Sequence, residues 1–253
     1  QLDRAESAYA DLASKHPKSA PIKLAYARIL VLNHDIPKAK AVGAELAKTD
    51  SSLPEVAVLN GMLLLNDGKP DDAFTLLQKA AKSNPDSLPV KLWLGRAAQS
   101  KGDLKTAQQS FSDATRINPR NMEAQEALAG AAIQNRDYST LLEVSQSAIA
   151  ANPQSAIPYV WRGVAEANQK LMDKAEADFR TALKLDPKNW AANLELGQLR
   201  LVQQKLPEGK TLLEQALDSN PNSSRALRLL VSALLAEKQP ALALSRVQQQ
   251  ITK

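Results

Sequence analysis

"KLDPKNWAANLELG", residues 184–197, combines a proline turn, a helix start and a small residue inside a helix, and this combination recurs along the chain. The stretches "KSNPDSLPVKLWLG" at 82–95 and "RINPRNMEAQEALAG" at 116–130 repeat it. Proline cannot continue a helix, because it lacks the backbone N–H and its ring clashes with the preceding turn. Asn189, two residues after Pro187, is a favoured residue for capping a new helix. The stretch therefore predicts the end of one helix and the start of the next.

The turn prolines recur at a fixed spacing of 34 residues. They are Pro85, Pro119, Pro153, Pro187 and Pro221, with Pro17 two periods before Pro85 and Ser51 at the missing position. A second turn falls midway in each period, where Gly68 and Gly102 offer left-handed C-caps. A fixed period of this length predicts stacked repeats of helix, turn, helix and turn.

Polar residues stand where each predicted helix begins, and we expect their side chains to cap the free backbone N–H groups. After the proline turns these residues are Ser19, Ser87, Asn121, Ser155, Asn189 and Ser223. After the midway turns they are Asp35, Asp103 and Asp137.

Small residues recur in register inside the predicted helices. In the first helix of each repeat they are Ala27, Gly61, Gly95, Ala129, Gly163 and Gly197, with Val231 as the exception. In the second helix they include Ala39, Ala73, Ala107, Ala175 and Ala243. Two helices approach closely only where side chains are small, and a bulky neighbour such as Phe111 or Phe179 fills the space beside them. With the turns, these positions make the whole chain resemble the tetratricopeptide repeat family.

The resemblance implies an all-α, right-handed α-solenoid of 34-residue helix-turn-helix repeats, with about fifteen helices. We expect residues 1–253 to form a single solenoid that is a segment of a longer array. Residues 1–19 would be the second helix of a truncated repeat. Full repeats are expected at 20–53, 54–87, 88–121, 122–155, 156–189 and 190–223, with a nearly complete one at 224–253.

The repeat at 122–155 is the least regular, because Leu141 and Ser145 exchange the expected small and bulky residues. We expect a changed helix crossing or a more mobile joint there. The tryptophan that the family places near the start of the first helix is mostly replaced, by Lys23, Lys91, Gln125 and Asn193.

Composition limits the possible functions. Hydrophobic residues make up 44% of the chain and aromatic residues only 4%, which suits helices packed on helices. The absence of cysteine excludes disulfides and thiolate metal sites. The net charge of +5 comes without a run of like charges, so nucleic-acid binding through charge alone is not indicated. No apolar run approaches the length of a membrane span.

The sequence offers no constellation of nucleophile, base and acid. His16 and His34 lie at turns, and two histidines without cysteine make a weak metal site. Acidic pairs such as Asp71 and Asp72 stand at helix starts, where negative charge suits the helix dipole. We therefore expect no enzyme activity, cofactor or metal in this segment.

In the resembled family, the first helices line a concave groove that holds peptides or helices. Opposite the small residues, this face is apolar with arginines between. We expect the groove to be lined by Leu24, Arg28, Val58, Met62, Leu92, Trp93, Arg96, Val160, Trp161, Val164, Leu194, Gln198 and Arg228. Tryptophan and arginine are frequent interface anchors. Alternatively, Trp93 and Trp161 pack against the adjacent repeat.

The favoured hypothesis is a non-catalytic scaffold that binds a protein or peptide segment of unknown identity in the groove. A second hypothesis is a recruiting arm of a larger enzyme or of a bacterial envelope assembly or export protein. A third is a structural array whose groove is filled by self-association. Nucleic acid is not expected as a partner, because the groove positions are mainly aliphatic. The array resembles bacterial examples, which favours a cell envelope or periplasmic location over the cytoplasm.

Overall fold

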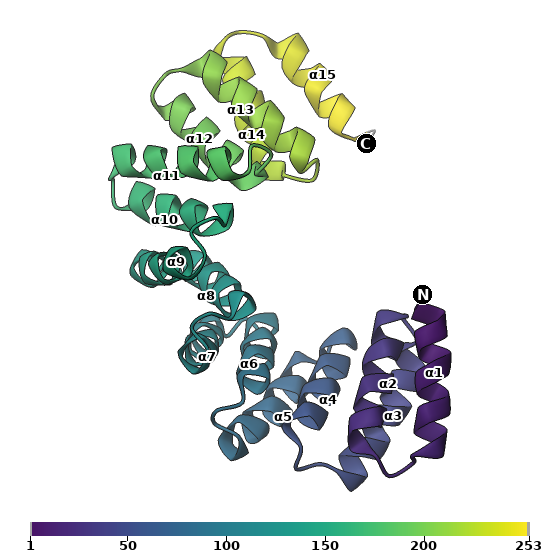
Figure 1. The fold of residues 1–253 in the computed structure, drawn as a ribbon. Helices are drawn as coiled ribbons and strands as arrows, with labels where there is room; N and C mark the ends of the chain where they lie inside the picture. The colour runs from purple at the N-terminus through teal and green to yellow at the C-terminus, as the bar shows by residue number, and fades with distance from the viewer. Residues whose placement is uncertain (1, 252–253) are drawn as a thin grey trace. The chain divides into compact units, whose positions relative to one another are not determined.

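The structure, a computed structural model, describes residues 2–251, and this range is built from fifteen α-helices without a strand. The helices are α1 (Leu2–Lys15), α2 (Ala20–Leu32), α3 (Ile36–Thr49), α4 (Pro54–Asn66), α5 (Pro70–Ser83), α6 (Leu88–Ser100), α7 (Leu104–Ile117), α8 (Met122–Asn135), α9 (Tyr138–Ala151), α10 (Ala156–Asn168), α11 (Met172–Leu185), α12 (Trp190–Val202), α13 (Leu206–Ser219), α14 (Ser224–Ala236) and α15 (Pro240–Ile251) (Figure 1). The all-α class and the number of helices agree with the sequence prediction.

The helices form two compact units, which we call unit 1 (Gln1–Asn135) and unit 2 (Arg136–Lys253). The boundary falls inside the repeat at 122–155, which the sequence marks as the least regular. The prediction of one continuous solenoid, and that of an altered crossing in this repeat, both stay predictions.

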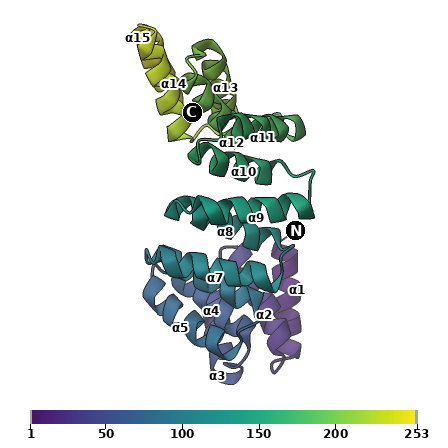
Figure 2. The same ribbon diagram turned by 90° about the vertical axis from the view of Figure 1, so that its left-hand side faces the viewer.

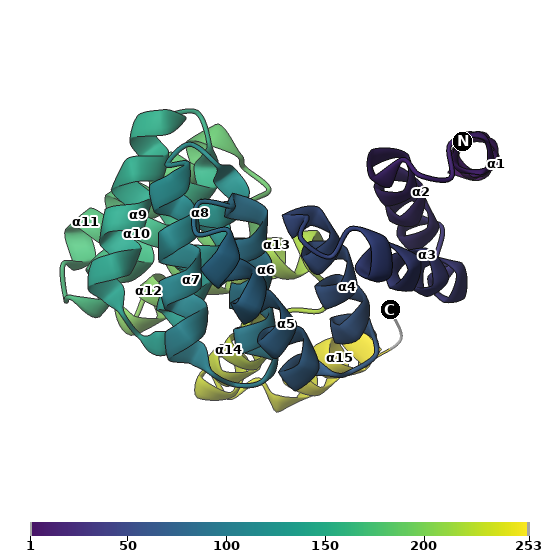
Figure 3. The ribbon, with the colours of Figure 1, turned by 90° about the horizontal axis from the view of Figure 1, so that it is seen from below.

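Within each unit, consecutive helices pack as pairs, and the first helices of successive pairs also contact one another. In unit 1, α2 packs on α3, α4 on α5 and α6 on α7, while α4 contacts both α2 and α6 (Figure 3). In unit 2, α10 packs on α11, α12 on α13 and α14 on α15, while α12 contacts both α10 and α14 (Figure 2). The first helix of each repeat therefore contacts the first helices of its neighbours and also the second helix of the preceding repeat.

The close approach inside a pair depends on glycine. A methyl group built on Gly95 of α6 would lie 2.4 Å from Cε1 of Phe111, and one on Gly163 of α10 would lie 2.5 Å from Cε1 of Phe179. Both phenylalanine rings are almost completely buried. The ring thus occupies the space that a side chain would need, as the recurring small residues predict.

Helix capping follows the sequence prediction in part. Asp35, Asp103 and Asp137 each accept the backbone N–H three residues on, as do Asn121, Asn189 and Ser223. The capping bonds predicted for Ser19, Ser87 and Ser155 are wrong, since these side chains accept no capping bond. Proline follows two or three residues after each of these serines, at Pro21, Pro89 and Pro158, and removes one of the donors that a cap uses.

The turns between the two helices of a repeat contain a residue with a left-handed backbone. Gly68 and Gly102 adopt it, with φ of 68° and 84°, as predicted. The same position holds non-glycine residues in the other repeats: His34, Arg136, Lys170, Gln204 and Lys238, with φ between 55° and 65°. The sequence does not reveal these five, because lysine and glutamine rarely adopt this conformation.

The residues that replace the family tryptophan form partly buried hydrogen bonds. Gln125 and Asn193 donate to the carbonyls of the turn residues Pro119 and Pro187, over 2.7 and 3.3 Å. Lys91 lies 2.9 Å from Asp113 of α7. Polar groups thus take over a position that tryptophan would fill by packing, and each one ties its helix to a neighbouring turn or helix.

Candidate functional site

The structure divides the predicted groove residues into a buried and an accessible set. The aliphatic residues Leu24, Val58, Leu92, Val160 and Leu194 are all buried. They belong to the core between helices, so their side chains are not available to a partner in this conformation. Of the others, Arg28 and Arg228 are exposed, while Met62, Trp93, Arg96, Trp161, Val164 and Gln198 are half-buried.

In unit 1, the accessible residues gather on α4 and α6. Met62 and Trp93 both pack on the edge of one core cluster, which places them on neighbouring helices of the same surface. The guanidinium of Arg96 lies 4.4 Å from the centroid of the Trp93 ring. Arg96 also contacts Glu123 of α8 over 2.6 Å. The guanidinium of Arg96 therefore packs against the Trp93 ring, and the surface of α6 presents an aromatic ring next to a positive charge.

In unit 2, the corresponding surface is formed by α10, α12 and α14. Trp161 and Val164 are half-buried on α10, and Gln198 is half-buried on α12. Arg225 of α14 pairs with Glu195 of α12 over 2.9 Å and also contacts Gln198. Arg228 is exposed, and no partner is seen for it among the described residues.

Several exposed apolar residues near the ends of first helices were not predicted as site residues. Val202 is 67% exposed, Leu32 59% and Leu235 52%. Leu32 and Val202 are the last residues of α2 and α12, and neither belongs to the groove face inferred from the sequence. These exposed residues could have been predicted from the sequence, because each is an apolar residue in the last turn of its helix, and the last turn of a helix has few neighbours that cover it.

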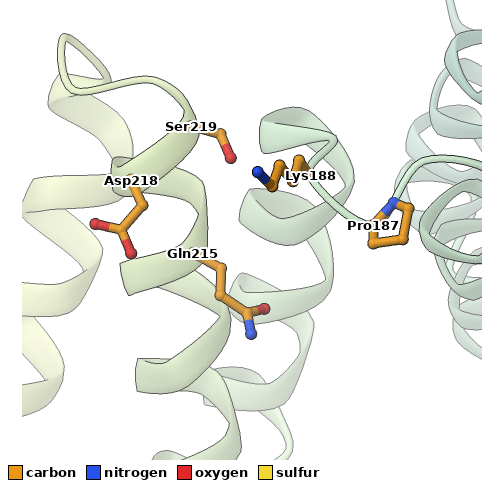
Figure 4. Close-up of a pocket in the computed structure, with 5 residues that line it drawn as sticks. All are labelled: Pro187, Lys188, Gln215, Asp218 and Ser219. Carbon is orange, nitrogen blue, oxygen red and sulfur yellow. The ribbon is translucent and has the colours of Figure 1, made fainter.

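A polar hollow lies in unit 2 between the turn before α12 and the end of α13. It is lined by Pro187, Lys188, Gln215, Asp218 and Ser219 (Figure 4). Lys188 and Ser219 extend toward one another, whereas the carboxylate of Asp218 points away (Figure 4). Among the described residues no hydrogen bond joins Lys188 and Ser219, so the two are not arranged as a nucleophile–base pair.

Acidic residues also meet between α10 and α11. Arg162 forms a bidentate pair with the buried Asp178, over 2.6 and 2.7 Å. Glu166 lies one turn further along α10, and its Oε2 is buried without a hydrogen-bond partner among the described residues. Burial, and secondarily the charge of Asp178, raise the pKa of Glu166. None of these three residues lines the hollow described above, and we interpret the cluster as part of the packing of unit 2.

We expect Glu166→Gln to stabilise the protein at pH 8 by about 1 kcal/mol, because the amide carries no charge to bury. A carboxyl group with a raised pKa costs stability only as pH rises from its unfolded pKa, near 4.5, through the folded value. The variant and the original protein should therefore be equally stable near pH 4. Urea unfolding at the two pH values measures this, and an equal difference at both would contradict it.

The described residues contain no group of three or more histidine, cysteine, aspartate or glutamate side chains placed to hold a metal ion. His16 and His34 are both exposed at turns. Among the helices of residues 2–251, none has the length and apolar character needed to cross a membrane.

Comparison with known proteins gives the family. A family model described as "Tetratricopeptide repeat" matches residues 64–131 and 167–233, and a second model with the same description matches 143–189. The human "Protein O-mannosyl-transferase TMTC1" is 22% identical over 167 residues, which are 64% of this chain. That match spans only 19% of the human protein.

Solved structures show the same fold at low sequence identity. The "APC/C hetero-tetramer Cut9-Hcn1" matches 92% of this chain and 46% of its own, with a TM-score of 0.68 and 19% identity. YrrB, described as "a TPR protein with an unusual peptide-binding site", matches 74% of this chain and 96% of its own, with a TM-score of 0.57 and 18% identity. The first of the two family models alone matches more than half of the residues, and the chain therefore belongs to the tetratricopeptide repeat family.

Proposed function

We propose that this chain binds a protein segment on the first-helix surfaces of its two units, without catalysis of its own. The tetratricopeptide repeat is in general a scaffold for protein–protein interaction, and the finer assignment rests on the accessible residues. The observation that carries it is the combination of Trp93 with Arg96 on α6, where an aromatic ring and a guanidinium share one surface. These two residue types dominate the energetic centres of protein interfaces.

The proposed partner is a segment with apolar anchors that alternate with acidic groups. Met62, Trp93, Trp161 and Val164 offer half-buried apolar contacts. Arg28 and Arg228 are exposed cations for which no partner is seen among the described residues, so each can pair with a carboxylate. A peptide-binding site is stated for YrrB, which shares the fold. A partner bound here would cover the accessible residues and leave the buried aliphatic ones in the core.

We expect the double variant Trp93→Ala and Trp161→Ala to weaken binding at least tenfold, because a buried aromatic anchor contributes on the order of 2 kcal/mol. Peptides are first selected from a displayed random library on the purified chain. Their dissociation constants are then measured by fluorescence polarisation. Trp190→Ala is the matched control, since Trp190 is 42% exposed at the start of α12 and lies outside the groove face. Unchanged affinity in the double variant, or an equal loss of affinity in the control, would contradict the proposal that Trp93 and Trp161 contact the partner.

A recruiting arm of a larger enzyme is the second candidate. The similarity to part of TMTC1, which is named a transferase, favours it over a self-associating structural array. The complete gene tests this candidate, since a catalytic domain encoded beside the repeats would support it. Self-association would be revealed by light scattering, as a mass that rises with protein concentration.

A further inference from the structure

Three of the turns between paired helices in unit 2 share a similar composition. Each has an exposed lysine within three residues of an exposed apolar residue. We call the following six residues the turn-tip patch: Lys170, Leu171, Val202, Lys205, Leu235 and Lys238. The three turns lie between α10 and α11, α12 and α13, and α14 and α15, and follow one another along one edge of unit 2 (Figure 1). The pattern is therefore a linear series and not three isolated lysines.

The backbone at these turns favours glycine, yet two of the three turns place a lysine there and the third places Gln204. Lys170 and Lys238 have φ of 65° and 58°. In unit 1, Gly68 and Gly102 occupy the same position of the repeat, as does His34 with φ of 60°. A residue with a side chain in this conformation costs about 1 kcal/mol relative to glycine. The same conformation occurs at His34, Arg136 and Gln204, so it belongs to this turn in general, and the charge and exposure of the lysines are what matter for the patch.

The apolar members of the patch are exposed to solvent. Val202 is 67% exposed, Leu235 52% and Leu171 41%. They are aliphatic, whereas surfaces that bind single-stranded nucleic acid usually offer aromatic rings for stacking. Aliphatic tips between lysines match the boundary between lipid headgroups and acyl chains, where lysine stems extend along apolar surface and their ammonium groups reach the phosphates.

The neighbouring acidic residues leave most of this positive charge uncompensated. Glu208 is paired with the buried Arg200 over 2.7 Å, and Glu237 is paired with Lys210. Asp173 is exposed, and Lys174 follows it directly. No ion pair is seen among the described residues for Lys170, Lys205 or Lys238. The free charge of the patch is thus complementary to an anionic surface.

We infer that the turn-tip patch of unit 2 docks peripherally on an anionic lipid membrane. The lysines supply the electrostatic attraction and the aliphatic residues enter the headgroup region. Val202 and Leu235 lie at the ends of α12 and α14, outside the residues proposed for protein binding, and neither assignment depends on the other. The chain would then hold a protein partner and a membrane through different residues.

The test is flotation of the purified chain with lipid vesicles. We expect binding to vesicles of phosphatidylcholine with about a third phosphatidylglycerol, and none to phosphatidylcholine alone. Lys170→Gln, Lys205→Gln and Lys238→Gln together should lower the partition coefficient at least tenfold, since each lysine near an anionic surface contributes severalfold. Val202→Ser and Leu235→Ser together should lower it about threefold or more.

The matched control replaces three exposed lysines on the second helices of unit 1, Lys48, Lys79 and Lys82, with glutamine. It removes the same net charge and should lower binding less than twofold. Equal loss in both lysine variants would overturn the inference, because net charge would then account for binding. Binding to polyglutamate but not to the vesicles would also overturn it, and would assign the patch to an acidic protein segment. Circular dichroism shows whether each variant is folded.

Discussion

Replacing Gly95 with alanine should destabilise the protein by about 2–3 kcal/mol, the usual range for overpacking a filled core. The added methyl carbon would lie 2.4, 2.6 and 2.8 Å from three carbons of the Phe111 ring. The ring is only 1% exposed, so it cannot turn outward to make room. Either α6 and α7 move apart or the ring leaves its rotamer, and both changes reduce packing. Urea denaturation followed by circular dichroism measures the loss.

Gly130→Ala is the matched control for this prediction. Gly130 lies inside α8, also in unit 1, and no heavy atom is found within 4 Å of the methyl carbon that would be added. Alanine lowers the conformational entropy of the unfolded chain, so this variant should gain about 0.5–1 kcal/mol. The same substitution should therefore have opposite signs in two helices. If Gly95→Ala and Gly130→Ala lowered the free energy of unfolding by similar amounts, the clash with Phe111 would not explain the effect at Gly95.

A double-mutant cycle separates the contact from other effects of Gly95→Ala. Phe111→Leu removes the ring carbons that approach the methyl group most closely. The alanine should then cost at least 1 kcal/mol less than it does beside phenylalanine. If its cost is the same beside leucine, the clash with the ring is not the cause.

Glu176→Gln should destabilise the protein by about 3 kcal/mol, because it leaves a charge buried without its main partner. Arg200 of α12 is completely buried, and both of its terminal nitrogens lie 2.7 Å from the oxygens of Glu176 on α11. Glu208 is a further partner, at 2.7 Å. Breaking a buried pair from one side is costly, since the remaining ion keeps its desolvation penalty.

The opposite substitution should have a much smaller effect. Arg200→Leu removes the buried charge, and Glu176 is left at a position that water reaches. Leucine occupies the same position of the repeat at Leu30, Leu64 and Leu234, so its volume fits this environment. We expect a change of about 1 kcal/mol or less. Equal losses in Glu176→Gln and Arg200→Leu would contradict the view that an unpaired buried charge is the cause.

The pH dependence gives an independent check on this pair. Hydrogen bonds from Arg200 lower the pKa of Glu176 from 4.5 to about 2. A carboxylate with a lowered pKa stabilises the fold fully above its unfolded pKa, and this contribution is lost as pH falls from about 4.5 to about 2. The stability of the original protein and of Glu176→Gln should therefore converge in that interval. A constant difference from pH 7 to pH 2 would exclude the ion pair as the source.

The sequence predicts the repeat register and the fold because both depend on local chemistry. Pro187 ends a helix and Asn189 caps the next one, independently of what packs on them. The contact between Gly95 and Phe111 recurs between Gly163 and Phe179, with the same spacing in the sequence. That spacing therefore predicts which helices form a pair. These features lie within one period and repeat, which makes them visible in the sequence.

The candidate site is less predictable because burial depends on how neighbouring helices meet. Leu92 and Trp93 are adjacent on α6, yet Leu92 is 2% exposed and Trp93 is half-buried. A rotation of the helix by part of a turn exchanges such neighbours between core and surface, and the periodic pattern does not resolve it. The strained turn at Lys170 is hidden for another reason, since its side chain favours other backbone conformations.

The contact between Gly95 and Phe111 also limits how such an array can change during evolution. The first helix of one repeat is fitted to the second helix of the same repeat, through a ring that leaves no room for a methyl group. Recombination inside a repeat would combine a first helix with a second helix from another repeat. A first helix with alanine at this position could then face a phenylalanine, which leaves no room for the methyl group. Duplication or exchange of whole helix pairs keeps the fit. The heritable module is therefore the pair of helices, and the array can lengthen or shorten only in steps of one pair.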